Sequence, residues 1–163
     1  MLNRRALDAR LESAWARAEH EGVPFGLIFC DLDHFKRVND TQGHAVGDRV
    51  LAQAACNLSR SLRGGDAVGR YGGEEFLAVI DSGAEETLAL VARRLRRMLA
   101  SDAVSGVAVT ASFGVASSTR FASLADLIAS ADRALYEVKR RGRDCCVLAA
   151  SATDLRLLTD GEA

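Results

Sequence analysis

The sequence predicts an α+β fold in which helices flank a central, mostly antiparallel sheet of five strands. Of the 163 residues, 48% are hydrophobic, which is enough for a core in a single domain. Apolar residues change between helical and strand-like spacing along the chain, and the predicted elements follow the order αβαββαβαβ. That order contains the βαββαβ core of ferredoxin-like folds.

The first two elements are a helix and a buried strand. Asn3 is a suitable N-cap, and apolar residues recur at helical spacing to about Glu21, where Gly22 and Pro24 end the helix. The continuously apolar run of residues 25–30 then predicts a buried strand that ends at the acidic residues after it.

A helical pair and a hairpin follow. Residues 34–41 are typical of a short helix or loop, and apolar spacing predicts a helix over 46–62 that ends near two glycines. Two strand-like runs between residues 66 and 81 enclose Gly72 and Gly73, which is a hairpin signal.

The C-terminal half alternates helices and strands. Apolar spacing over 88–99 predicts a helix, and the β-branched run 107–117 predicts a central strand. Ser123, with Asp126 three residues later, resembles a capping box at the start of the last long helix. Residues 145–148 are expected to form the closing strand.

Two acidic clusters lie where strands are expected to end. Glu74 and Glu75 occupy the hairpin tip, and Asp31 and Asp33 follow the buried strand. Carboxylates at strand ends are the hard oxygen ligands that a magnesium ion and a nucleotide triphosphate require. Asp33 shares the strand face of Asp31, so its role is open between metal binding and capping of the next segment.

The charge and cysteine content restrict the partners and the compartment. The formal net charge of −1 gives no overall attraction to nucleic acid, so neither DNA nor RNA is expected as a partner. The four cysteines form no CxxC pair, and Cys30 and Cys56 fall in predicted core segments, so we expect reduced, buried thiols in a cytoplasmic protein. No apolar run is long enough to cross a bilayer.

The motifs resemble those of the GGDEF family of diguanylate cyclases, here in a Gly-Gly-Glu-Glu-Phe form. The matches keep their order and approximate spacing, and they include these segments: 3–5, 31–36, 39–40, 43–44, 47–48, 70–76, 112–116, 131–132 and 142–143. The resemblance implies the polymerase-palm-like fold of nucleotidyl cyclases. It also implies that residues 1–163 are one catalytic domain, the cytoplasmic part of a larger sensor whose upstream sensory region, membrane-bound in some such sensors, is absent from this chain.

The implied reaction joins two GTP molecules into cyclic di-GMP and releases two pyrophosphates. It requires Mg²⁺ or Mn²⁺ and a homodimer in which two domains face each other. The resemblance makes Asp31, Glu74 and the carbonyl of Leu32 the metal ligands. Glu75 then binds a second metal or helps to deprotonate the attacking hydroxyl.

Further residues match the family's substrate-binding positions. Asn39 and Asp48 match guanine-binding positions, and a carboxylate can accept hydrogen bonds from guanine N1–H and N2–H. The remaining matches are assigned to the phosphates and their surroundings: Lys36, Lys139, Arg143, the backbone of His34 and Phe35, and Gly72 and Gly73. The glycines are expected to permit positive φ and close approach of the nucleotide.

A second site is implied upstream of the hairpin. Arg63 and Asp66 resemble the family's RxxD inhibitory site, and Arg94 matches a secondary arginine, so cyclic di-GMP is expected to inhibit as well as to be the product. Asp144 departs from the asparagine that relatives often carry, and we expect its charge to weaken substrate binding modestly.

Two alternatives remain at this point. One is a catalytically silent module that binds cyclic di-GMP or GTP, against which the intact acids argue. The other is a cyclase with a different nucleotide preference, which would be insensitive to Asp48→Ala.

Overall fold

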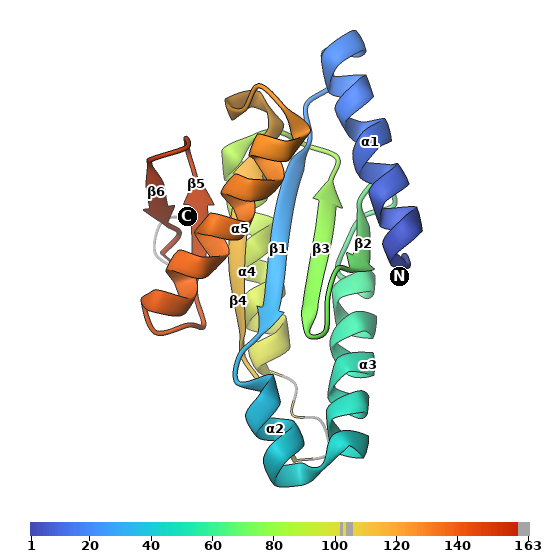
Figure 1. Cartoon of the computed structure of the whole chain (residues 1–163), viewed down its shortest axis with the longest axis vertical. Coiled ribbons are helices and arrows are strands. Elements are labelled where there is room, and N and C mark those ends of the chain that lie inside the picture. Colours follow the sequence, from blue (N-terminus) through green and yellow to red (C-terminus); the bar gives the residue numbers. More distant parts are fainter. Residues whose placement is uncertain (102, 104–105, 160–163) are drawn as a thin grey trace.

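A six-stranded sheet forms the centre of the protein in the computed structural model, which describes residues 1–101, 103 and 106–159 (Figure 1). The strand order is β2-β3-β1-β4-β5-β6, and only the β4–β5 pair is parallel. The strands are β1 Gly26–Leu32, β2 Ala67–Arg70, β3 Glu75–Ile80, β4 Ala111–Ser117, β5 Cys146–Ala149 and β6 Leu155–Leu157. The predicted α+β class is confirmed, but the prediction of five strands is wrong because β6 adds an edge strand.

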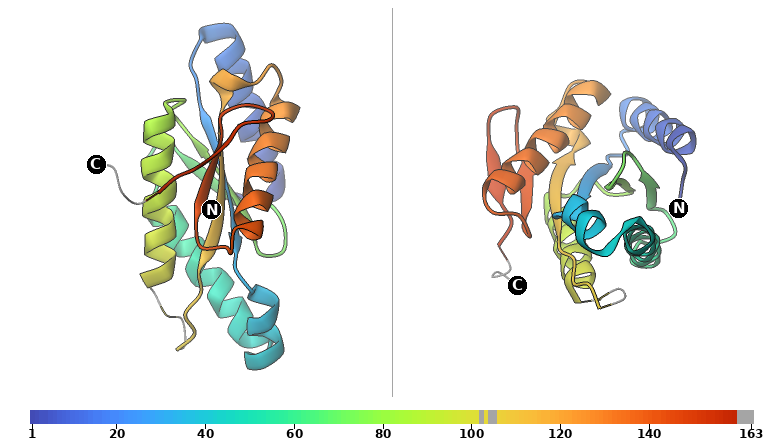
Figure 2. Two further views of the ribbon diagram at one scale, coloured as in Figure 1. Left: turned by 90° about the vertical axis from the view of Figure 1, so that its left-hand side faces the viewer. Right: turned by 60° about the horizontal axis from the view of Figure 1, so that its bottom comes forward.

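Helices cover both faces of the sheet, and a short one, α2, lies beyond the end of β1 (Figure 1 and Figure 2). The helices are α1 Arg4–Glu21, α2 Phe35–Gln42, α3 His44–Arg60, α4 Glu85–Ser101 and α5 Leu124–Arg140, and a short 3₁₀ turn spans Ser118–Arg120. The apolar sides of α1 and α5 pack on one face. Those of α2, α3 and α4 pack on the other. The sheet is therefore buried on both sides in its centre.

Strand β1 is the most enclosed element because it lies between β3 and β4 and under helices on both faces. All seven of its residues are buried. Alternate side chains enter the two cores: Ile28 and Cys30 pack toward α3 and α4, whereas Leu27 and Phe29 pack toward α1 and α5. Burying one such side chain contributes about 1.5–3 kcal/mol, so the register of β1 is strongly specified.

The helix caps that the sequence predicts are present. The side chain of Asn3 accepts a hydrogen bond from the Ala6 amide, and that of Ser123 accepts one from the Asp126 amide. Gly22 ends α1 in the left-handed conformation with φ of 67°.

Two local predictions are wrong. Strand β4 begins at Ala111 rather than at residue 107, because the β1–β4 ladder ends where Leu32 pairs with Ala111. Cys56 is exposed on α3 instead of buried, although Cys30 and Cys146 do lie in the core. Among the described residues, no helix is long and apolar enough to span a membrane.

Gly114 of β4 lies directly against the backbone of α5. A Cβ at this position would meet the carbonyl oxygen of Ala131 and the backbone of Leu135, with the Leu135 Cα at 2.9 Å. Because backbone atoms cannot rotate away, we predict that Gly114→Ala destabilises the protein by about 3 kcal/mol, or roughly 6–12 °C in Tm.

The matched control is Gly64→Ala, since a Cβ at Gly64 has nothing within 4 Å. Thermal unfolding followed by circular dichroism measures both variants. Equal melting temperatures for the two would contradict the close contact between β4 and α5.

Candidate functional site

The site is assembled where β1 ends beside the tip of the β2–β3 hairpin. Asp31 is the direct cross-strand partner of Glu75, and the Leu32 amide donates a hydrogen bond to the Glu74 carbonyl at 3.3 Å. Two clusters that lie more than 40 residues apart in sequence are therefore neighbours in the sheet. The structure brings together Asp31, Leu32, Glu74 and Glu75, as the sequence predicted.

The hairpin tip is held by main-chain bonds and by one arginine. The Tyr71 amide donates to the Glu75 carbonyl at 2.8 Å. The Arg70 guanidinium donates to the Gly72 carbonyl at 3.1 Å and to the Gly73 carbonyl at 2.6 Å. Arg70 was not a predicted site residue. Its position two residues before the glycine pair is the signal that could have identified it.

The glycines of the tip do not use the backbone freedom expected of them, whereas the expected close approach of the nucleotide stays a prediction. Neither Gly72 nor Gly73 has a positive φ, so the prediction of positive φ is wrong. A Cβ on Gly72 would collide with the Glu75 carboxylate, whereas one on Gly73 would meet nothing within 4 Å. Gly72 therefore leaves room for the Glu75 side chain.

The carboxylates at the site interact unfavourably with one another. Burial, and secondarily the charge of Asp33, raise the pKa of Asp31, although Lys139 and Arg143 oppose this rise. Burial, followed by the charge of Asp31, raises the pKa of Glu75. A divalent cation would relieve this repulsion by favouring both ionised forms.

Lys139 neutralises Asp31 directly. Its Nζ lies 2.8 Å from Asp31 Oδ2, and the Asp31 side chain is only 9% exposed. Lys139 is in the last turn of α5, and Arg143 lies in the loop that follows this helix. The predicted phosphate-binding cations thus lie at the same end of the sheet as the acids.

The donor set suits magnesium shared with a nucleotide. No group of three or more His, Cys, Asp or Glu side chains is arranged to hold a metal within residues 1–101, 103 and 106–159. Mg²⁺ is commonly bound by one or two carboxylates together with waters and substrate phosphates, and it does not need an all-protein cage. Asp31 and Glu74, with the Leu32 carbonyl, fit that requirement.

Asp33 has a different environment from Asp31. Its carboxylate is 5% exposed and accepts hydrogen bonds from Thr110 Oγ1 at 2.7 Å, Ser112 Oγ at 2.6 Å and the Asp144 amide at 3.1 Å. Of the two roles left open by the sequence, these bonds favour a structural one.

Helix α2 begins directly after the acids of β1. His34 is its exposed N-cap residue, in the left-handed conformation with φ of 56°, and Phe35 is buried. Lys36 is exposed on the first turn. These positions allow backbone and side-chain groups of residues 34–36 to face an anion.

The predicted guanine-binding residues lie on the α2–α3 pair, which turns at Gly43. Asn39 packs against Gly47, where a Cβ would collide with its amide oxygen and lie 3.2 Å from Phe35 Cζ. Asp48 follows as an exposed residue of α3. The absence of a side chain at Gly47 therefore brings Asn39 close to the helix that carries Asp48.

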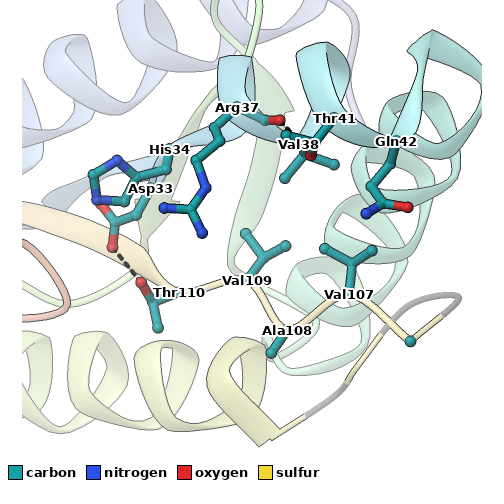
Figure 3. Close-up of a pocket in the computed structure, with 11 residues that line it drawn as sticks. Asp33, His34, Arg37, Val38, Thr41, Gln42, Val107, Ala108, Val109 and Thr110 are labelled. Carbon is teal, nitrogen blue, oxygen red and sulfur yellow. Dashed lines mark hydrogen bonds between the residues drawn. The ribbon is translucent and has the colours of Figure 1, made fainter.

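A cavity of about 380 Å³ lies beside α2 and is lined by residues of this helix other than Asn39 (Figure 3). Its lining includes Asp33, His34, Arg37, Thr41, Gln42 and Val109. Of the predicted substrate-binding residues, only His34 lines it, so this cavity does not correspond to the predicted guanine site.

The predicted inhibitory residues lie at the other end of the hairpin, before β2. The Asp66 carboxylate accepts hydrogen bonds from the Arg63 amide at 3.1 Å and from the Asp81 amide at 2.9 Å, which closes the base of the hairpin. Arg94 of α4 donates to the Ser61 carbonyl at 2.6 Å. Arg63, Asp66 and Arg94 are thus held in one region, away from the acidic tip.

Two further acids, Asp132 and Asp144, lie near the site and make electrostatic contacts that the sequence did not indicate. Asp132 is exposed on α5, and its charge contributes to the raised pKa of Glu75, a coupling that no sequence pattern revealed. The Asp144 carboxylate lies 3.0 Å from Arg96 Nη1. The expectation that Asp144 weakens phosphate binding loses its basis, because Arg96 of α4 offsets this charge.

Comparison with known proteins agrees with this geometry. Residues 1–145 match the family described as diguanylate cyclase, GGDEF domain. Diguanylate cyclase DgcP of Pseudomonas aeruginosa is 37% identical over 146 residues, which cover 87% of this chain but 22% of DgcP. The chain therefore spans less than a quarter of that relative's length.

Two solved structures are similar throughout the fold. The GGDEF domain of DgcB from Caulobacter crescentus, in complex with c-di-GMP, has a TM-score of 0.85 at 35% identity and 91% coverage of both chains. The active GGEEF domain of a diguanylate cyclase from Vibrio cholerae has a TM-score of 0.85 at 34% identity, covering 90% of this chain and 96% of that one.

The raised pKa of Glu75 gives a prediction about stability. A raised pKa means that the folded protein binds this proton more tightly than the unfolded chain, so ionised Glu75 disfavours folding at neutral pH. We predict that Glu75→Gln raises Tm by about 1–3 °C at pH 7. The gain should shrink as pH falls through the pKa of Glu75, because protonation then removes the same charge from the wild type.

Differential scanning calorimetry at pH 7 and pH 4 measures this effect, with Glu12→Gln on the exposed side of α1 as the control. A lower Tm for Glu75→Gln than for the control at pH 7 would show that the ionised Glu75 carboxylate does not destabilise the folded protein.

Proposed function

The chain belongs to the diguanylate cyclase GGDEF-domain family, and from this premise we propose that residues 1–163 form one catalytic domain that condenses two GTP into cyclic di-GMP and two pyrophosphates. The observation that carries the proposal is the cross-strand pairing of Asp31 with Glu75 at the hairpin tip. Phosphoryl transfer is catalysed mainly by positioning and by charge neutralisation, and this region holds acids and cations together.

We assign the metal to Asp31, Glu74 and the Leu32 carbonyl, with Mg²⁺ or Mn²⁺ as the ion. When bound, this ion neutralises the triphosphate and favours in-line attack. Glu75 is assigned to deprotonation of the 3′-hydroxyl or to a second ion. Its raised pKa suits proton uptake, because a carboxylate with a higher pKa is a stronger base.

The nucleotide is oriented by groups on three elements. Lys36 of α2, together with Lys139 and Arg143 at the end of α5, binds phosphate oxygens, and the backbone near His34 and Phe35 adds N–H donors. Asn39 and Asp48 bind the guanine edge. Asp48 selects GTP over ATP because its carboxylate accepts from N1–H and N2–H, whereas adenine N1 is itself an acceptor.

Ring closure requires a second copy of the domain. Each copy binds one GTP, and the 3′-hydroxyl of each attacks the α-phosphate of the other, so a homodimer is the active form. We propose that an upstream sensory region of the full-length protein brings the two copies together. The four free cysteines favour a reducing compartment, which agrees with a cytoplasmic reaction.

Product feedback is assigned to Arg63, Asp66 and Arg94. The DgcB domain that this chain resembles was crystallised with c-di-GMP, which makes binding of the product plausible for this fold. A shallow cavity of about 230 Å³ adjoins Arg63 and Asp66. The guanidinium of Arg63 can pair with a phosphate or with a guanine edge.

The direct test is incubation of the purified chain with GTP and Mg²⁺, followed by identification of the product by mass. We predict cyclic di-GMP, with a rate per protomer that falls on dilution because two copies are needed. Glu74→Ala should lower the rate on the order of 100-fold or more, because it removes a metal ligand. The control Glu86→Ala changes an exposed acid on α4.

Product formation that survives Glu74→Ala would refute the metal assignment. Bound GTP or cyclic di-GMP with no turnover in the wild type would identify a silent binding module instead. A constant rate per protomer down to nanomolar protein would contradict the two-copy reaction.

The feedback assignment is tested by Arg63→Ala. Loss of a charge-assisted contact is expected to raise the inhibition constant for cyclic di-GMP by about 10-fold or more. Initial rates, taken before product accumulates, serve as the reference for each variant. The control is Arg60→Ala, an exposed arginine one turn earlier. An inhibition constant that is unchanged in Arg63→Ala would place product binding elsewhere.

A further inference from the structure

Asp33 is a buried carboxylate that accepts its hydrogen bonds from uncharged groups. Two hydroxyls and one backbone amide donate to it, and its own amide donates to the Thr110 carbonyl at 2.8 Å. Figure 3 shows the Asp33 carboxylate turned toward the Thr110 side chain. Buried carboxylates are usually retained where they are paired or where their hydrogen bonds organise several segments.

The bonds of Asp33 join three parts of the chain. Asp33 follows β1, Ser112 is in β4, and Asp144 is in the loop after α5. This loop is the segment that carries Arg143. Asp33 therefore ties the strand end that bears Asp31 to the loop that bears a predicted phosphate-binding cation.

Local bonds hold only the start of that loop, where the Arg143 amide donates to the Val138 carbonyl at 3.1 Å. Arg143 and Asp144 have φ values of 70° and 45°, a left-handed conformation that is unfavourable for residues other than glycine. Bonds from outside the loop support it: the Asp144 amide donates to Asp33, and Arg96 Nη1 donates to the Asp144 carbonyl at 3.1 Å. Without these bonds the loop would be free to relax.

We propose that Asp33 is a positioning residue for substrate: it holds the loop after α5 so that Arg143, beside Lys139 of the last turn of α5, faces the nucleotide phosphates next to Asp31. This proposal rests on the proposed function, because it takes the phosphates as the ligand of that site. Asp33 does not bind the metal in this account. Its oxygens are committed to Thr110, Ser112 and Asp144.

The decisive comparison is Asp33→Asn with Asp33→Ala. In Asp33→Asn, the amide oxygen can still accept from the Asp144 amide, and the amide nitrogen can donate to the Ser112 hydroxyl, which can also act as an acceptor. We expect GTP affinity, measured by calorimetry, to stay within about 3-fold of the wild type in Asp33→Asn and to fall about 10-fold in Asp33→Ala. KM for GTP should follow the same pattern, with kcat less affected.

Asp31→Asn is the reference for a lost metal ligand. Binding of Mn²⁺ alone, followed by electron paramagnetic resonance, should weaken in Asp31→Asn but remain near the wild-type value in Asp33→Asn. Mn²⁺ binding that weakens equally in both variants would make Asp33 a ligand and overturn the proposal. So would GTP affinity that is unchanged in a folded but less stable Asp33→Ala, because the role of Asp33 would then be purely structural.

If Asp33→Ala does not fold, Arg96→Met releases the same loop from the α4 side. We expect GTP affinity about 3-fold below the wild type, and unchanged affinity would overturn the proposal.

A wild type that binds GTP without making cyclic di-GMP would refute the proposed function but not the positioning role, since the binding comparisons still decide it. Product formation by the wild type with no difference between Asp33→Asn and Asp33→Ala would refute only the positioning role.

Discussion

The antiparallel register between β1 and β3 is the constraint on which the site depends. It sets Asp31 opposite Glu75, and it places the hairpin tip at the level where β1 ends. A slip of one residue would turn every side chain of β1 to the other face of the sheet. Because both faces of β1 are packed with apolar side chains, the hydrophobic core fixes the geometry of the acids.

This arrangement is electrostatically costly. Burial raises the pKa values of both Asp31 and Glu75, and the charges of Asp33 and Asp31, respectively, add to these two rises. Lys139, 2.8 Å from Asp31, opposes the rise at Asp31. Perturbed ionisation of this kind is typical of functional sites, where part of the stability is given up for chemistry. Asp33 differs because three hydrogen bonds satisfy it, and its contribution is to hold neighbouring segments in place.

Most of the fold could be predicted from the sequence because its signals are local. The caps at Asn3 and Ser123, the hairpin glycines and the apolar run of β1 each have a direct structural counterpart. Strand β6 was missed because three residues, two of them exposed, carry no alternating pattern that can be recognised. The exposed position of Cys56 was missed because the whole helix was taken as core, although Cys56 lies two residues from buried Ala54 and Leu58 and so on the opposite side of α3.

The sequence also indicated which residues would form the candidate site, but not how they contact one another. The approach of Asp31 to Glu74 at the hairpin tip was expected from strand ends and motifs. The ion pair between Lys139 and Asp31 joins residues 108 positions apart, and the bond from the Asp144 amide to Asp33 joins residues 111 apart. Neither contact follows from local patterns, since both depend on how α5 packs across β4 and β1.

The central claim is that Asp31 and Glu74 bind one divalent cation together with the nucleotide. The most direct measurement is a crystal structure of the chain grown with Mn²⁺ and a non-hydrolysable GTP analogue, with the ion located by anomalous scattering. The account predicts a manganese peak within about 2.3 Å of oxygens from both carboxylates and in contact with the triphosphate. Manganese bound to the triphosphate while either carboxylate points away from it would contradict the account.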